Sequence, residues 1–318
     1  MAASADTTGA TRKNLVLAAM VFAVAMTFID QTIVAIAIPD LQKELSLSAT
    51  GSQWIINGYL LALSALFAFG GKVADVMGRR RVVVIGVVGF AAASALCGAT
   101  PTGAVAETWI IVFRVVQGGF AALMFPAAVG IVVASFPLRE RGRAIAIFFG
   151  ISGGLTAIGP IAGGFLTEWT WRSIFWINIP VALIALYLIW RSKPDDTRRP
   201  TPLDYRGTVL VTAAMVLVVL GFQQSAVWGW SSAATWLCIV AGLVLMAVFV
   251  VLELRIPSPL LRLQIFADRG FATETWSSGS CRSSSSRSSS SAACTRRYRW
   301  ARARPRRAST SSTSSSAS

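Results

Sequence analysis

The sequence lacks histidine, contains few charged residues and has no paired cysteine motif. Histidine is absent from all 318 residues, which excludes imidazole bases, histidine-containing triads and His-Glu-x-x-His zinc sites. Charged residues make up 14% of the chain, whereas a water-soluble domain has about a quarter. The four cysteines form no C-x-x-C pair, so neither a zinc site nor a disulfide framework is indicated. These absences argue against a metal or thiol enzyme and against a soluble protein.

Hydrophobic residues dominate instead, at 54% of the chain with a mean hydropathy of +0.63. A helix that crosses a bilayer needs about 20 predominantly apolar residues. The sequence therefore predicts an all-α integral membrane protein. The eight predicted spans are Leu15–Ile38, Trp54–Gly71, Val82–Ala99, Thr108–Val133, Ala144–Leu166, Ser173–Trp190, Gly207–Phe222 and Ala234–Leu252.

The first span has one competing interpretation, a cleaved signal peptide. Arg12 and Lys13 precede it, and Ala35-Ile36-Ala37 resembles a cleavage site. However, its apolar stretch exceeds the roughly 7–15 residues of a signal peptide, and it carries Asp30. We therefore predict a retained helix.

The positive charges between the spans predict the orientation. Seventeen Lys and Arg residues lie in the N-terminal arm, the even-numbered loops and the segment after the eighth span, whereas the odd-numbered loops hold only Lys43 and Arg172. Cytoplasmic loops carry the excess of basic residues, so we expect a multi-pass protein of the cell membrane with both termini cytoplasmic. The predicted organisation is an arm (1–14), a six-helix bundle (15–190), a linker (191–206), two further helices (207–252), a juxtamembrane segment (253–276) and a tail (277–318).

The tail differs abruptly from the rest of the chain. Residues 277–318 contain 18 Ser and 9 Arg with no acidic residue, a composition that cannot bury a core and predicts disorder. Such an arm could bind nucleic acid or anionic lipid, but we expect no nucleic-acid partner. We interpret the change as a truncation or frame shift after about residue 271, since Arg without Lys and long Ser runs fit out-of-frame reading of GC-rich DNA.

Asp30 and Arg114 are the ionisable residues inside the spans of the predicted bundle. A charge at mid-membrane costs about 2.5–3.5 kcal/mol, so such groups usually pair or line a pathway. At 1.5 Å per residue, both lie roughly 9–12 Å from the outer ends of their helices. If the first and fourth helices adjoin, the two can interact. Burial favours the neutral acid and a nearby guanidinium favours the carboxylate, so we predict proton coupling, with a static ion pair as the alternative.

Gln117 and Gly118 lie one turn after Arg114, on the same face of the fourth helix. That face suits either a substrate or a closely packed helix. The fifth span contains two small-xxx-small pairs, Gly150/Gly154 and Gly159/Gly163, which permit tight helix contacts in lipid. Pro160 removes a backbone hydrogen bond and should kink this helix, which suits either a moving or a static contact.

Six motifs occur in chain order. They are Asp30–Val34 with Ile38-Pro39; Gln53-Trp54 with Tyr59-Leu60; the loop Gly71–Arg81; Arg114, Gln117, Gly118 and Gly119; Gly159, Pro160, Gly163 and Gly164; and Trp171-Arg172, Phe175 and Asn178–Pro180. Together they resemble the major facilitator superfamily, in particular its fourteen-helix drug:proton antiporters, over roughly residues 10–271. The loop departs from the pattern G-x-L-x-D-r-x-G-r-r at Val73 and Val76.

The resemblance implies a six-helix amino-terminal bundle followed by two extra helices. It implies proton coupling through Asp30 and Arg114, a cytoplasmic gating loop and a bundle interface at the antiporter-motif helix. The gating residues would be Gly71, Asp75, Gly78, Arg79 and Arg80, and the interface residues Gly159, Pro160, Gly163 and Gly164. The loop by itself is equally consistent with a positive-inside anchor.

We therefore expect a proton-driven exporter of lipophilic or cationic compounds, present as an incomplete chain. It would use the proton gradient and no cofactor, and its partners would be the bilayer, a small-molecule substrate and a second six-helix bundle. A non-transporting membrane fragment is the alternative, and a membrane enzyme or sensor is disfavoured because no acids or nucleophiles gather at a common depth.

Overall fold

The computed structural model describes residues 2–194 and 205–254, with side chains for 11–194 and 207–254. The regular elements of the described residues are all helices, and eight helical spans among them are long and apolar enough to cross a membrane. Each predicted span coincides with one of these. The predicted tail, nearly all of the juxtamembrane segment and most of the linker lie outside the described residues.

The first four spans are single helices: α1 (Ala2–Leu45), α2 (Ala49–Met77), α3 (Arg79–Gly98) and α4 (Ala106–Ser135). They extend beyond the predicted apolar segments, and the predicted arm is helical from Ala2 onward. Polar helix ends account for the difference, because hydropathy marks the part of a helix that suits lipid and not the whole helix.

The fifth and sixth spans are interrupted. The fifth consists of α5 (Arg141–Gly154), a 3₁₀ turn η1 (Leu155–Ala157) and α6 (Ile158–Thr167). The sixth consists of α7 (Ser173–Trp176) and α8 (Asn178–Ser192), separated at Ile177. The break at η1 contains Thr156, four residues before Pro160, as expected because proline cannot donate a hydrogen bond to the carbonyl four positions earlier.

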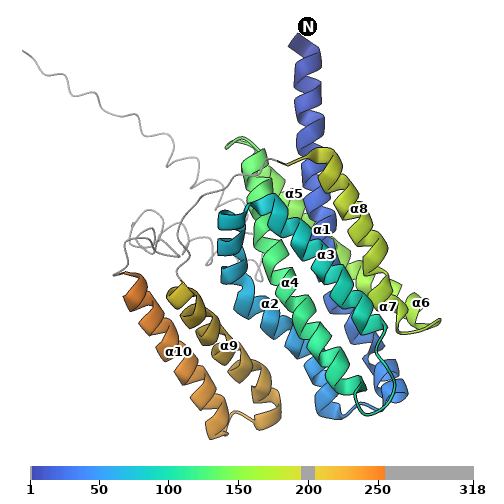
Figure 1. The fold of residues 1–318 in the computed structure, drawn as a ribbon, viewed down its shortest axis with the longest axis vertical. Helices are drawn as coiled ribbons and strands as arrows, with labels where there is room; N and C mark the ends of the chain where they lie inside the picture. The colour runs from blue at the N-terminus through green and yellow to red at the C-terminus, as the bar shows by residue number, and fades with distance from the viewer. Residues whose placement is uncertain (1, 195–204, 255–318) are drawn as a thin grey trace, which may run out of the picture. The chain divides into compact units, whose positions relative to one another are not determined.

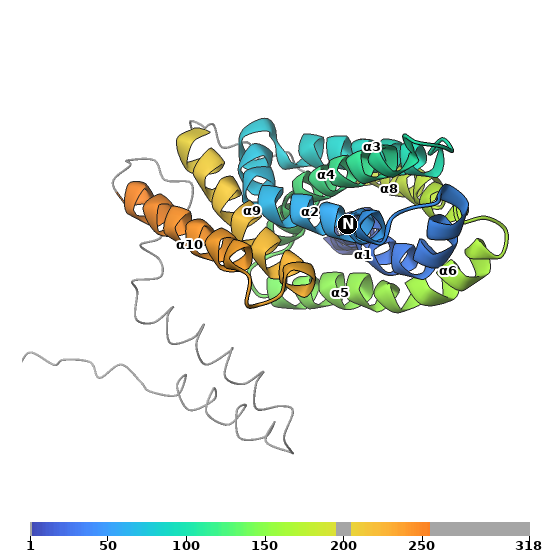
Figure 2. The same ribbon diagram turned by 90° about the horizontal axis from the view of Figure 1, so that it is seen from below.

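The helix α1 occupies the interior of the six-span bundle. It contacts α4, α5, α6 and α8, and Figure 2 shows it between the α3–α4 side and the α5–α6 side. More than half of its most apolar stretch is buried, the highest share among the eight described spans. A side chain on α1 therefore faces several helices at once, which places Asp30 where distant segments meet.

Short connections join the helices tightly. Ser48 caps α2 by accepting a hydrogen bond from the Gly51 amide, and the carboxylate of Glu107 in α4 accepts from the Ser48 amide and hydroxyl. At the other end of α2, Gly78 alone separates it from α3, with a φ of 101°. Glycine reaches that conformation at no steric cost, which accounts for a glycine at this turn.

The remaining helices, α9 (Tyr205–Trp228) and α10 (Ala233–Glu253), pack against each other along their lengths. Figure 1 shows them as an antiparallel pair. Their contact is close at Gly221 and Gly242, where an added Cβ would meet the opposite helix. The chain therefore carries a six-span bundle and a further helical hairpin, as predicted.

Candidate functional site: a buried polar cluster around Asp30

Asp30 and Arg114 form an ion pair inside the bundle. Arg114 Nη1 lies 2.5 Å from Asp30 Oδ2, and the side chains are 1% and 0% exposed. The pair joins α1 to α4, so the condition set for their interaction, that the first and fourth helices adjoin, is met. Because both charges lie away from water, each depends on the other for its stability.

Two further contacts fix the guanidinium. Arg114 Nε donates to the Ile55 carbonyl of α2 at 2.9 Å, and the guanidinium lies 4.4 Å from the centroid of the Tyr59 ring. Ile55 and Tyr59 both project from α2, so that helix holds Arg114 from the side opposite α1. The arrangement combines a charge-assisted hydrogen bond with a cation–π contact, and both are strengthened by desolvation.

Gln117 closes a triangle with the ion pair. Its Oε1 accepts from Arg114 Nη1 at 2.9 Å, and its Nε2 donates to Asp30 Oδ1 at 3.0 Å. The side chain is fully buried, so both ends of the amide are used. Gln117 thus belongs to the polar cluster, whereas Gly118 packs against α2, since an added Cβ there would overlap the Tyr59 carbonyl.

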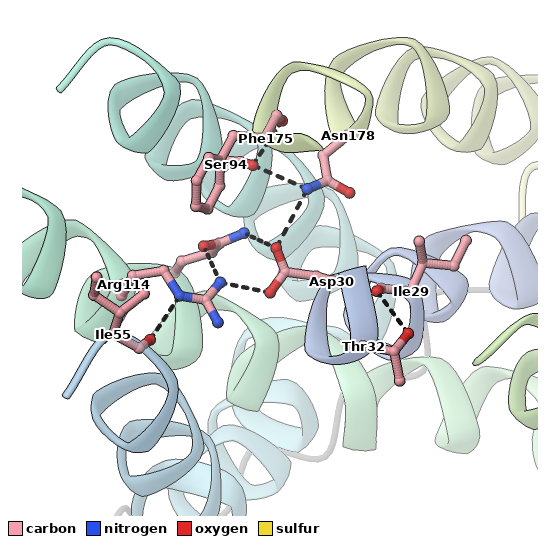
Figure 3. A network of polar contacts seen from close by, with 9 residues as sticks. Ile29, Asp30, Thr32, Ile55, Ser94, Arg114, Phe175 and Asn178 are labelled. Atoms are coloured by element: carbon pink, nitrogen blue, oxygen red, sulfur yellow. Dashed lines mark hydrogen bonds and ion pairs between the residues drawn. The ribbon is translucent and has the colours of Figure 1, made fainter. Parts of the chain in front are cut away.

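A second polar arm reaches the Asp30 carboxylate from α8 and α3, as Figure 3 shows. Asn178 Nδ2, at the start of α8, lies 3.4 Å from Asp30 Oδ1 and donates to Ser94 Oγ of α3 at 2.9 Å. Ser94 in turn donates to the Phe175 carbonyl at 2.8 Å. Asp30 therefore links α1 with α3, α4 and α8.

The predicted loop residues meet at the α2–α3 turn. Asp75 Oδ1 accepts from Arg79 Nη2 at 2.9 Å, and Arg79 Nη1 donates to the Gly130 carbonyl of α4 at 2.9 Å. The contact ties α2, α3 and α4 together at the end of the bundle predicted to be cytoplasmic. Arg80 is half-buried beside it, and a Cβ at Gly71 would make an ordinary contact with Pro126.

Gly159 lies against α1, whereas the side chain of Pro160 beside it is exposed. The Thr156 carbonyl, whose usual donor would be the amide of position 160, lies 3.1 Å from Thr32 Oγ1 of α1, and that hydroxyl is shared with the Ile29 carbonyl of its own helix, also at 3.1 Å. A Cβ at Gly159 would overlap that hydroxyl, and one at Gly163 would press on Ile33. The second predicted small-xxx-small pair is confirmed as a tight contact.

The other glycines of this span behave differently. A Cβ at Gly150, Gly153, Gly154 or Gly164 would meet nothing within 4 Å among the described residues. The tight contact predicted for the Gly150/Gly154 pair is therefore not made there. These four glycines lie beside exposed apolar residues, among them Ile151, Ile161 and Phe165, so this face of the span is open.

Sequence reasoning missed the roles of Thr32 and Ser94 and used Asn178 only as part of a motif. An amide between Ile177 and Ile179 in an apolar stretch is itself a signal, because a polar residue in lipid needs a partner. Ser94 and Thr32 offered no such signal, since hydroxyls can bond their own helix. As for metal sites, no group of three or more Cys, Asp or Glu side chains gathers in the described part of the chain.

Eight membrane-length helices and an ionisable cluster buried among the first six define a polytopic membrane protein of the transporter type. The family model of the Major Facilitator Superfamily matches residues 20–261. The chain belongs to this superfamily.

Curated relatives of the chain are export and resistance proteins. It is 41% identical over 253 residues to the tetracenomycin C resistance and export protein of Streptomyces glaucescens, covering 79% of this chain and 46% of that protein. It is 39% identical over 248 residues to the puromycin resistance protein pur8 of Streptomyces alboniger, covering 77% and 48%. The chain thus spans about half the length of these relatives.

The fold also matches solved transporters. A crystal structure of a peptide transporter POT with a bound sulfate aligns with a TM-score of 0.55 at 18% identity, covering 76% of this chain and 52% of that chain. An auto-inhibited POT family peptide transporter aligns with a TM-score of 0.51 at 16% identity, covering 76% and 51%. At these identities the likeness concerns the fold alone.

Proposed function

We propose that this chain forms the amino-terminal half of a proton-coupled exporter of lipophilic or cationic small molecules, and that it is not an enzyme. The buried ion pair between Asp30 and Arg114 carries the proposal. An ionised carboxylate inside the membrane is costly, and such residues usually mark an ion or proton pathway. The export and resistance proteins among the relatives support the substrate class.

The proton gradient would supply the energy, and no cofactor is needed. A proton that enters from the outer side neutralises Asp30 and weakens its attraction to Arg114. Because the pair joins α1 to α4, its loosening changes the stability of one bundle conformation relative to another, and each state exposes the acid to a different side. The basic loops support this orientation, with the N-terminus in the cytoplasm of a bacterial cell.

We further propose that the partner is a second helical bundle. The open glycine face of α5 and α6 supports this, since Gly150, Gly153, Gly154 and Gly164 would let another helix approach closely. Substrates of such transporters bind between two repeats near the bilayer midplane. By analogy with the gating loop of the family, the Asp75–Arg79 pair would hold the cytoplasmic side closed in one access state.

The proposal is tested by efflux of ethidium, a lipophilic cation, from cells that express the chain alone or together with the carboxy-terminal bundle of a relative. We expect uncoupler-sensitive export with the second bundle and none with Asp30→Asn, although that variant should insert normally. Normal export by Asp30→Asn would refute proton coupling through this residue.

The alternative is a membrane protein that does not transport by itself. The finding that favours it is that the chain matches only about half of each relative. Export by the chain alone would exclude this alternative. If cells export no ethidium with the chain alone or with the chain and the second bundle, the alternative would be favoured over the proposed transporter.

A further inference from the structure

We propose that Asn178 and Ser94 are positioning residues that respond to the protonation state of Asp30 through a reversible flip of the Asn178 amide. The proposal rests on Asp30 being the proton-carrying group of the proposed function. It assigns a structural output to that group: a change in hydrogen bonding at the α7–α8 junction of the sixth span.

Asp30 accepts all of its side-chain hydrogen bonds from donor groups. Asp30 Oδ2 accepts from Arg114, and Oδ1 accepts from Gln117 Nε2 and Asn178 Nδ2. Each of these partners is a donor, which suits an ionised carboxylate, an acceptor-only group. In the observed arrangement the Asn178 amide nitrogen faces both Asp30 Oδ1 and Ser94 Oγ. The Ser94 hydroxyl donates its hydrogen bond to the Phe175 carbonyl.

A protonated Asp30 does not fit this arrangement. A proton on Oδ1 would face the donors Gln117 Nε2 and Asn178 Nδ2. A proton on Oδ2 would face the donor Arg114 Nη1. In a site where Asp30, Gln117 and Asn178 are each no more than 2% exposed, a donor left facing donors costs about 1–3 kcal/mol. Protonation must therefore bring an acceptor to the carboxyl group.

Of the two amides, Asn178 is the one free to turn. A flip of Gln117 would place its nitrogen against Arg114 Nη1, to which Oε1 now bonds at 2.9 Å. A flip of Asn178 places Oδ1 toward Asp30 and Ser94. The Ser94 hydroxyl can rotate and donate to this oxygen, because a hydroxyl is both donor and acceptor.

The flip carries a structural consequence. When Ser94 donates to Asn178, the Phe175 carbonyl loses its hydrogen bond from α3. Phe175 lies in α7, two residues before the break at Ile177. Proton uptake on α1 thus releases a backbone group at the α7–α8 junction and loosens α3 from the sixth span. No covalent bond changes apart from the proton bound by Asp30.

Among the described groups around Asp30, Asn178 is the one that links the carboxylate to the sixth span. The described titratable groups that interact electrostatically with Asp30 are Arg114 of α4, Tyr59 of α2 and Cys97 of α3. The third span otherwise contributes Ser94, and the sixth faces the carboxylate with the neutral Asn178. Arg114 already holds Oδ2, so the polar contact of Asp30 with α8 is the amide.

The test is pH-difference infrared spectroscopy on the purified chain in lipid nanodiscs, where the carboxylic-acid band that is lost in Asp30→Asn reports protonation of Asp30. We expect Asn178→Leu to shift its midpoint upward by about one pH unit, because the ionised form loses a donor. We expect Ser94→Ala to shift it less. Ser64→Ala is the matched control, since that hydroxyl donates only within α2, to the Leu60 and Leu61 carbonyls, and its midpoint should match the wild type.

The flip itself has a separate readout. The chain contains three asparagines, Asn14, Asn57 and Asn178, so ¹³C-labelled asparagine gives a side-chain carbonyl signal that Asn178→Leu identifies. We expect this signal to change with the same midpoint as Asp30 and to stay constant in Asp30→Asn.

Three outcomes would overturn the proposal, namely an unshifted midpoint in folded Asn178→Leu and Ser94→Ala, a pH-independent Asn178 signal, or an Asp30 that never protonates. The last would also refute proton coupling. If the Asn178 signal changes with the protonation of Asp30 but the chain exports nothing, alone or with the carboxy-terminal bundle, the amide flip would stand and only the transport proposal would be refuted.

Discussion

At the scale of single residues, the main feature is how many helices contribute to one carboxylate. The donors to Asp30 come from positions 84 to 148 residues away in the sequence. In water such a network would contribute little, because exposed ion pairs are worth about 0–1 kcal/mol. Inside the bundle, breaking it leaves an uncompensated charge, so each member constrains the others.

Replacing Arg114 should therefore destabilise the bundle more than replacing both partners. We expect Arg114→Met to lower the free energy of unfolding by about 3 kcal/mol or more, because it leaves a buried carboxylate without its counter-ion. The double variant Arg114→Met/Asp30→Asn should recover most of that loss. Detergent-titrated unfolding of the purified chain measures both, and equal destabilisation of the two variants would contradict an ion pair that stabilises the bundle.

At the scale of elements, the interrupted fifth span is stabilised from outside. Pro160 cannot donate to the Thr156 carbonyl, and Thr32 of α1 supplies the hydrogen bond instead. Thr32 lies two residues after Asp30 on the same helix. The polar cluster around Asp30 and the helix break are thus joined through half a turn of α1, and a shift of α1 acts on both.

Thr32→Val should leave the Thr156 carbonyl without its partner and cost about 1 kcal/mol of stability. Thr32→Ser, which keeps the hydroxyl, should cost less. In a Pro160→Ala background the restored amide can bond Thr156, so the effect of Thr32→Val should shrink. Detergent-titrated unfolding of the four-variant cycle measures this coupling.

The control for this cycle is Thr167→Val, because the Thr167 hydroxyl donates within its own helix to the Gly163 and Gly164 carbonyls. Its cost should be the same with or without Pro160. Additive effects of Thr32→Val and Pro160→Ala would show that the two helices are not coupled at this carbonyl.

At the scale of the whole molecule, the distribution of basic residues predicts the orientation in the membrane. Arg139, Arg141 and Arg143 lie near the α4–α5 connection, whereas the α3–α4 loop around Gly103 has no cation. The α4–α5 connection should therefore remain in the cytoplasm, and the α3–α4 loop should face outward. The orientation decides from which side a proton reaches Asp30 first.

Cysteine labelling tests this orientation. In a chain with all four cysteines replaced, Gly103→Cys should react with a membrane-impermeant maleimide in intact cells. Gly142→Cys should react only after permeabilisation. An added Cβ would meet nothing within 4 Å at either site, and the strain that a side chain brings to the positive φ of Gly103 falls in an exposed loop. The reverse pattern would place the N-terminus outside and contradict the proposed direction of proton entry.

Much of this protein is determined by the sequence alone. Eight apolar segments predicted eight helical spans, because lipid requires each span to satisfy its backbone hydrogen bonds internally. The mid-membrane charges indicated that Asp30 and Arg114 can interact if the first and fourth helices adjoin, and α1 and α4 do adjoin. Pro160 predicted the interruption of the fifth span, and Gly78 marked the turn of the α2–α3 loop.

The tertiary structure decided which neighbours these residues meet. Neither the hydroxyl of Thr32 on the Thr156 carbonyl nor the arm from Asp30 through Asn178 to Ser94 has a signature in one helix, because each contact needs helices far apart in the sequence. It also separated the contacting glycines, Gly159 and Gly163, from the open ones, Gly150 and Gly154. Spacing shows which residues share a face, but the packing of other helices determines whether that face is covered.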